Sequence, residues 1–254
     1  MLANSENTPN KSLFTQASQT NHKPVVDLQL AFGGFSTKGL KAENQDAFAA
    51  IVPEKLDLRA KGAVVAIADG VSSANCAAKA SQMSACHFIN EYIATPETWS
   101  VKKSASQVIG SLNNWLYAQQ LVADEQGRLE QWFSTFTALI LKGERGHIFH
   151  IGDCQVAKIN SDGYQVLTKE HASLSGTLNR ALGAGSHIDI DITSTNLAQN
   201  DILVLTYDKR GVGESGGVYA GPEVGTNNIS IENLNLLASS IPVQVVIVLS
   251  IAMV

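Results

Sequence analysis

The chain has 254 residues, a formal net charge of −5 and 44% hydrophobic residues. This length and apolar content allow one large domain or one domain with appendages. The acidic balance lacks the basic footprint of nucleic-acid-binding proteins, so no nucleic-acid partner is expected. The three cysteines, Cys76, Cys86 and Cys154, have no metal-type spacing, and their odd number favours a reducing, cytoplasmic compartment.

The first part of the chain is expected to be a leader followed by strands. Residues 1–24 are polar, contain no apolar segment of the kind that a signal peptide needs, and are predicted to be disordered. Apolar, β-prone stretches follow over residues 25–35 and 47–52. Residues 63–68 form a continuous apolar run that stops at Asp69, which is typical of a buried strand that delivers an aspartate to its end.

Two helical patterns come next, and a series of short strands follows them. The first helix is expected over residues 75–93, and the second carries a one-sided apolar stripe that core packing explains most simply. The stripe consists of Val108, Ile109, Leu112, Trp115 and Leu116. Short strands separated by turns are expected over residues 137–141, 147–151, 155–159 and 164–167. Successive hairpins imply antiparallel pairing, so the sequence predicts an α+β chain of sheets flanked by helices.

The C-terminal residues 241–254 form an uncharged apolar run. This run is too short for a standard transmembrane helix, so no clear membrane span is expected. A buried strand over residues 245–249 is the favoured interpretation, and a short membrane-associating tail is the alternative.

Four aspartates stand at turns next to apolar runs, namely Asp46, Asp69, Asp153 and Asp208. Carboxylates that converge from several strand ends suit a hard divalent cation, because Mg²⁺ and Mn²⁺ prefer oxygen ligands. A water held by such a metal is a nucleophile for phosphate or ester hydrolysis. The ordinary preference of aspartate for turns also explains each residue taken alone, so only the set as a whole favours a metal site.

Five short strings stand out in order along the chain, namely Lys38–Ala47, Ala68–Gly70, Ser134–Ala138, Ile151–Cys154 and Thr168–His171. In their order and spacing they resemble the motifs of the metal-dependent type-2C (PPM-type) protein serine/threonine phosphatases of the bacterial branch. Residues 201–206 resemble the strand that leads to the next Asp-Gly motif of that family, so the likeness covers roughly residues 28–208. Val71 stands where other branches carry a histidine.

The resemblance implies two packed antiparallel β-sheets flanked by helices, with a binuclear Mn²⁺ or Mg²⁺ centre at one edge. In such a centre Asp69 would bridge the two metals, with the Gly70 carbonyl as a further ligand, and Asp46 would hold one metal through its water shell. Asp153 would serve a third, weaker metal site. Asp208 would match a later metal ligand of the family.

The resemblance also implies a reaction, which is one-step attack of a metal-bridged hydroxide on the phosphorus of phosphoserine or phosphothreonine. Asp69 and Asp46 would lie at its catalytic centre, and no cysteine nucleophile is needed. Lys41 stands where many members carry an arginine that grips the substrate phosphate; lysine keeps the charge but loses the bidentate fork. The partner would be a phosphorylated protein, with a protein kinase left open as a second one. His171, at the end of a strand pair, is expected to be structural.

The family pattern stops after Asp208. Asn227 and Asn228 stand where the family carries a late Asp-Asn motif, so one metal ligand is missing and the expected activity is weak. Residues 205–238 resemble instead a fragment of an α/β-hydrolase. The predicted organisation is a disordered leader over 1–24, a phosphatase-like domain over 25–208 and an atypical tail over 209–254.

Three functions therefore stay open. The leading one is a metal-dependent protein phosphatase, the alternative is a non-catalytic phosphoprotein-binding or regulatory module of the same fold, and the most distant is an α/β-hydrolase. Residues 213–217 match the G-x-S-x-G elbow of the hydrolases. No histidine follows His187, however, so Ser215 is expected to have no hydrolytic role.

Overall fold

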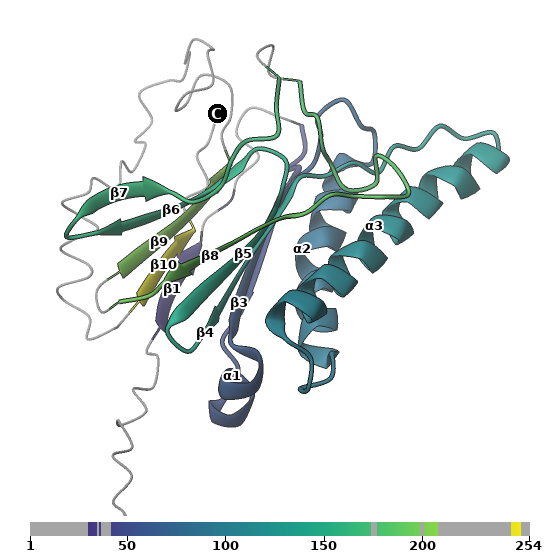
Figure 1. The fold of residues 1–254 in the computed structure, drawn as a ribbon. Helices are drawn as coiled ribbons and strands as arrows, with labels where there is room; N and C mark the ends of the chain where they lie inside the picture. Colours follow the sequence, from purple (N-terminus) through teal and green to yellow (C-terminus); the bar gives the residue numbers. More distant parts are fainter. Residues whose placement is uncertain are drawn as a thin grey trace, which may run out of the picture.

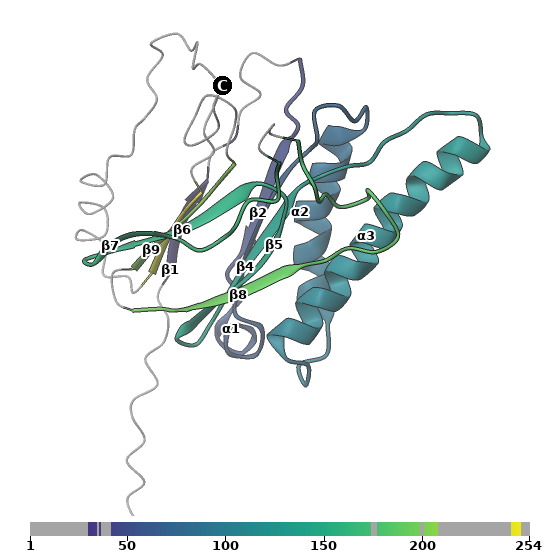
Figure 2. The ribbon, with the colours of Figure 1, turned by 45° about the horizontal axis from the view of Figure 1, so that its top comes forward.

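The computed structural model describes residues 30–34, 36, 42–173, 177–198, 201–207 and 245–249. Within them, two five-stranded sheets pack face to face, and the two long helices cover the outer face of one sheet (Figure 1). A view turned about the horizontal axis shows the same succession of layers, with the helices, the helix-covered sheet and the second sheet one behind the other (Figure 2).

The helix-covered sheet is antiparallel throughout, in the order β2-β3-β4-β5-β8. Its strands are β2 (Asp46–Ile51), β3 (Ala63–Asp69), β4 (Phe136–Lys142), β5 (Arg145–Ile151) and β8 (Asp191–Asn196). The second sheet has the order β1-β10-β9-β6-β7. Its strands are β1 (Leu30–Gly34), β10 (Val245–Leu249), β9 (Asp201–Tyr207), β6 (Cys154–Asn160) and β7 (Gly163–Val166). β10 runs parallel to both of its neighbours.

Strand β3 is buried on both faces, because it lies between the helices and the second sheet. Its residues alternate between two cores, since successive side chains of a strand point to opposite faces. Val64, Ala66 and Ala68 pack with the helices. Val65 and Ile67 pack against the second sheet. This double burial explains why the strand is a continuous apolar run and not an alternating one.

The helices of the described residues are α1 (Lys55–Lys61), α2 (Ala77–Ala94) and α3 (Val101–Glu125). None of them combines the length and the hydropathy needed to cross a membrane. The apolar stripe expected on α3 is confirmed for the buried residues Val108, Ile109, Leu112 and Leu116. Trp115 differs, because it is 39% exposed and packs edge-on against Trp132, with the ring centroids 5.7 Å apart.

The fold class expected from the sequence is confirmed, since the chain is α+β with two packed sheets and flanking helices. The strand expected over residues 245–249 is β10, but its parallel pairing departs from the antiparallel pattern of the other strands. Parallel neighbours need a long crossover connection, and the chain between β9 and β10 is long enough to supply one. The leader 1–24 and residues 209–244 and 250–254 of the expected tail lie outside the described residues.

Two elements were not foreseen from the sequence. Helix α1 has only 7 residues, most of them charged, so it carries almost no apolar periodicity. Strand β8 reads DITSTN and is largely exposed, so it lacks the apolar alternation of a half-buried strand. Both elements take their shape from the neighbours they pack against and not from a local pattern.

Tyr92 ties α2 to the end of α1. Its side chain is 1% exposed, and its hydroxyl donates to the Lys61 carbonyl oxygen at 2.9 Å. Burial raises the pKa of Tyr92 to about 12, so the hydroxyl remains a donor at neutral pH. Tyr92→Phe is expected to lower the free energy of unfolding by about 1–2 kcal/mol, because a buried carbonyl loses this donor. Urea denaturation measures the loss.

Tyr164→Phe is the matched control for this change. The Tyr164 hydroxyl also makes one hydrogen bond, to Gln155 Oε1 at 2.9 Å, but the residue is 55% exposed and water can replace the bond. The control should therefore leave the unfolding midpoint almost unchanged. Equal losses in the two variants would contradict the prediction.

Candidate active site

Asp46 and Asp69 face each other across two neighbouring strands. Asp46 opens β2, Asp69 ends β3, and the two form a directly opposed pair in the antiparallel ladder. Side chains of such a pair point to the same face of the sheet, with their Cβ atoms about 4.5–5.5 Å apart. Asp46 is 7% exposed, and one carboxylate oxygen of each residue is buried. Two negative charges so placed repel each other, and a divalent cation beside them would offset the repulsion.

The polar turn before β2 holds Asp46 in place. The Asp46 amide donates to Asn44 Oδ1 at 3.1 Å, which makes an Asx-type turn. The Gly70 amide donates to the Gln45 carbonyl at 2.8 Å, so the same turn is tied to the end of β3. The backbone on both sides therefore fixes Asp46 relative to Asp69.

Thr135, which precedes β4, holds the end of β3. Its hydroxyl accepts from the Asp69 amide at 3.0 Å, and its own amide donates to the Asp69 carbonyl at 2.8 Å. Ser134 Oγ donates to the same carbonyl at 3.1 Å. At the next residue, Gly70, an added Cβ would lie 2.4 Å from the carbonyl oxygen of Ala77 at the start of α2. A glycine at this position lets the helix approach the strand end closely.

Asp153 lies in the tight turn between β5 and β6, at the same end of the sheet. Antiparallel pairing brings the ends of β3 and β5 together with the starts of β2 and β4 at this edge. Gly152, just before Asp153, has a φ of +108°, and an added Cβ would lie 2.6 Å from the Thr135 Cβ. The turn thus packs directly on the residue that anchors Asp69. One carboxylate oxygen of Asp153 is also buried.

Cys154 follows Asp153 and is not a nucleophile in this setting. Its side chain is 1% exposed, and its Sγ lies 3.2 Å from Thr135 Oγ1. Burial raises the pKa of the Cys154 thiol well above its ordinary value, and the negative charges of Asp153 and Asp69 raise it further. A thiol that stays protonated lacks the reactivity of a thiolate.

The donor set at this edge fits Mn²⁺ or Mg²⁺ better than a softer metal. Asp46, Asp69 and Asp153 offer carboxylate oxygens, which hard divalent cations prefer. Among the described residues, no three histidine, cysteine, aspartate or glutamate side chains form a ready-made ligand group. A bound ion would therefore complete its coordination with water and carbonyl oxygens, which Mg²⁺ sites commonly do.

The structure brings together the expected site residues Asp46, Asp69, Gly70 and Asp153. Lys41 and Asp208 lie outside the described residues, and their roles stay predictions. A cavity of about 350 Å³ opens beside Asp46, between β2 and α2, and Asn44, Gln82 and Cys86 line part of it. The cavity offers a polar approach to the Asp46 end of the site.

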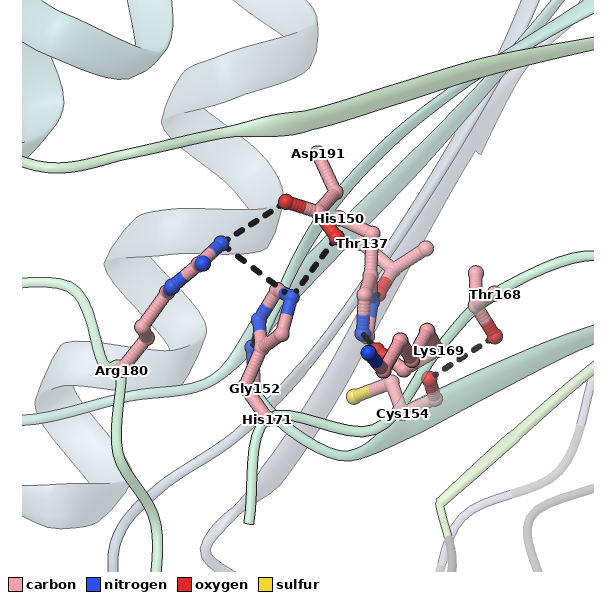
Figure 3. Close-up of polar contacts among 9 residues, drawn as sticks. All are labelled: Thr137, His150, Gly152, Cys154, Thr168, Lys169, His171, Arg180 and Asp191. Atoms are coloured by element: carbon pink, nitrogen blue, oxygen red, sulfur yellow. Dashed lines mark hydrogen bonds and ion pairs between the residues drawn. The ribbon is translucent and has the colours of Figure 1, made fainter.

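A polar network behind the Asp153 turn was not foreseen beyond His171 (Figure 3). His171 is 7% exposed and accepts from the Gly152 amide through Nδ1 at 3.0 Å, which agrees with the structural role expected for it. Its Nε2 lies 2.9 Å from Asp191 Oδ2, and Arg180 donates to Asp191 Oδ1 at 2.7 Å. Asp191 and Arg180 carry no distinctive string, so only the fold brings them to the site.

A family model described as protein phosphatase 2C matches residues 34–206. No curated protein matches the chain. The matched region ends before most of the segment that resembles an α/β-hydrolase, residues 205–238, and the comparisons give that resemblance no support.

Solved bacterial phosphatases share the fold. The serine/threonine phosphatase Stp1 from Staphylococcus aureus is 14% identical, with 81% of this chain and 87% of that chain covered and a TM-score of 0.56. The serine/threonine phosphatase PstP/Ppp from Mycobacterium tuberculosis is 20% identical, with 66% and 73% covered and a TM-score of 0.53. A PstP catalytic domain in complex with 2 manganese ions is 22% identical, with 66% and 72% covered and a TM-score of 0.51.

Proposed function

Since the chain belongs to the protein phosphatase 2C family, we propose that it is a metal-dependent phosphatase that hydrolyses phosphoserine and phosphothreonine in protein substrates. The observation that carries the proposal is the directly opposed pair of Asp46 and Asp69 at the edge of the helix-covered sheet. Such a pair is unfavourable in a sheet unless a cation offsets its charge. The solved relative that contains 2 manganese ions supports the choice of metal.

In this proposal Asp69 and Asp46 hold two Mn²⁺ or Mg²⁺ ions, together with the Gly70 carbonyl, and Asp153 serves a third, weaker site. When bound, such ions lower the pKa of water and neutralise charge on a phosphoryl group. The other residues of the chain fix these donors. Thr135 holds the end of β3, and its side chain supports the Asp153 turn.

Three further parts of the proposal concern residues and partners beyond the described site. Lys41 is assigned to the substrate phosphate and Asp208 to the metals, on the strength of the motif resemblance. The substrate is a phosphorylated protein, and a protein kinase would supply it. The proposed location is the cytoplasm, in keeping with the unpaired cysteines Cys76, Cys86 and Cys154.

The test is metal-dependent turnover of a phosphothreonine peptide and of an aryl phosphate by the full chain. Activity is expected with Mn²⁺ and should disappear with EDTA. Its level should be low, because Asn227 and Asn228 replace a metal carboxylate of the family motif, and loss of a ligand weakens metal binding. Turnover that persists in EDTA, or cleavage of carboxylic esters without metal, would contradict the proposal.

A non-catalytic phosphoprotein-binding module is the second candidate. The same two asparagines favour it, since an incomplete metal site loses catalysis before it loses the fold. Such a module would bind the phosphopeptide but not hydrolyse it at saturating Mn²⁺. Titration calorimetry with the peptide, read beside the turnover assay, separates the two functions.

A further inference from the structure

The Asp153 turn is held from behind by residues from separate parts of the chain (Figure 3). His171 binds the turn twice, because its amide donates to the Gly152 carbonyl at 2.7 Å and its Nδ1 accepts from the Gly152 amide at 3.0 Å. Asp191, at the start of β8, contacts the other ring nitrogen of His171. Arg180 completes the chain of contacts by donating to Asp191.

The hydrogen bonds fix one tautomer of His171. Since Nδ1 accepts from Gly152, a neutral ring carries its proton on Nε2 and donates it to Asp191 Oδ2, 2.9 Å away. Arg180 Nη1 is 3.3 Å from the same Nε2, but two donors cannot bond each other, so Asp191 is what joins Arg180 to the ring. Hydrogen bonds from His171 and Arg180 lower the pKa of the Asp191 carboxyl, which keeps it charged at neutral pH.

His150 packs beside the His171 ring. It is 1% exposed, with Nδ1 at 2.8 Å from Thr137 Oγ1 and Nε2 at 3.0 Å from the Lys169 carbonyl. The rings of His150 and His171 lie 4.8 Å apart. The turn is therefore packed between this ring pair and Thr135, and a shift of the turn would move Asp153 relative to Asp69.

We infer that His171, oriented by Asp191 and Arg180, is a positioning residue that sets the place of the Asp153 carboxylate and so the affinity of the third, weaker site for a divalent cation. The inference rests on the proposed function, because that function makes Asp153 a metal ligand. Residues that orient a metal ligand typically change metal affinity about 10–100-fold when they are replaced.

Two replacements of His171 separate its two hydrogen bonds. In His171→Asn, the side-chain oxygen lies near the place of Nδ1 and still accepts from Gly152. In His171→Gln, the amide reaches the place of Nε2 and keeps Asp191 but leaves Gly152 without this acceptor. Titration calorimetry with Mn²⁺ should show the affinity of this third site about 10–100-fold weaker in His171→Gln and only a few-fold weaker in His171→Asn. Asp191→Asn keeps the shape of the network but removes the charge of the carboxylate. Its affinity for Mn²⁺ should lie between those of the two His171 variants.

His187→Gln is the matched control, because His187 is exposed and pairs with Asp189, at 3.4 Å. It should leave the affinity for Mn²⁺ unchanged. Equal weakening in His171→Asn and His171→Gln, or wild-type affinity in His171→Gln, overturns the inference.

Amide hydrogen exchange tests the inference on the metal-free proteins. It reports on the two hydrogen bonds between His171 and Gly152, which we call the clamp. Exchange in residues 150–154 should be faster in His171→Gln than in His171→Asn or the wild type, because the Gly152 amide loses its acceptor. Equal exchange in all three proteins overturns the clamp even if Mn²⁺ binds. Wild-type protein that binds no Mn²⁺ overturns the proposed function and the effect on affinity, while faster exchange in His171→Gln would still establish the clamp.

Discussion

Asp69→Asn is expected to abolish Mn²⁺ binding and, with it, the metal-dependent phosphatase turnover, because the bound metal supplies the nucleophile. The substitution keeps the size of the side chain and removes the carboxylate that faces Asp46 across β2 and β3. Titration calorimetry with Mn²⁺ measures the first effect, and hydrolysis of an aryl phosphate measures the second.

The same variant should be at least as stable as the wild type when no metal is present. Like charges that stand directly opposite each other destabilise a sheet, and Asp69→Asn removes one of the two. With Mn²⁺ the order should reverse, because a ligand at a hundred times its Kd stabilises the protein that binds it by about 2.7 kcal/mol. A reversal in the order of the two melting temperatures on addition of Mn²⁺ would thus distinguish a metal ligand from a residue that only supports the fold.

Asp162→Asn is the control for Asp69→Asn. Asp162 lies in the exposed turn between β6 and β7, at the opposite end of β6 from Asp153 and in the other sheet from β3. Its replacement should change neither Mn²⁺ affinity nor turnover. Wild-type Mn²⁺ affinity in Asp69→Asn would contradict the assignment of this residue to the metals.

The sequence could predict the elements that carry the aspartates, because their signals are local. The continuous apolar run that ends at Asp69 needs no partner to be recognised, and the apolar stripe of α3 has a clear period. The same holds for the order of the motifs and for the family they resemble. These features account for the α+β fold and for the presence of Asp46, Asp69 and Asp153 at turns.

The sequence could not predict the register or the contacts between distant loops. The opposition of Asp46 and Asp69 depends on how β2 aligns with β3, and a shift of one residue would send one carboxylate to the other face. The contact of His171 with Asp191 joins two segments through β8, a polar edge strand without a pattern. The close packing of Gly152 on Thr135 joins the β5–β6 turn to the residue before β4 and has no local signal.

Gly152→Ala is expected to lower the free energy of unfolding by about 2–6 kcal/mol. Backbone strain at a φ of +108° contributes about 1–3 kcal/mol of this for a residue with a side chain. Overpacking contributes about 1–3 kcal/mol, because the added Cβ would lie 2.6 Å from both the Cβ and the Cγ2 of Thr135. Urea denaturation of the metal-free protein measures the total.

Gly163→Ala separates these two terms. Gly163 has a φ of +122°, close to that of Gly152, but its added Cβ would meet no atom of the described residues within 4 Å. This control should lose only the backbone term, about 1–3 kcal/mol, and it should keep its Mn²⁺ affinity, because it opens β7, at the opposite end of β6 from Asp153. Equal losses in the two variants would mean that packing on Thr135 does not require glycine at position 152. A larger loss in Gly152→Ala, joined to weaker Mn²⁺ binding, is expected because the atoms that the new methyl displaces belong to the residue that holds Asp69.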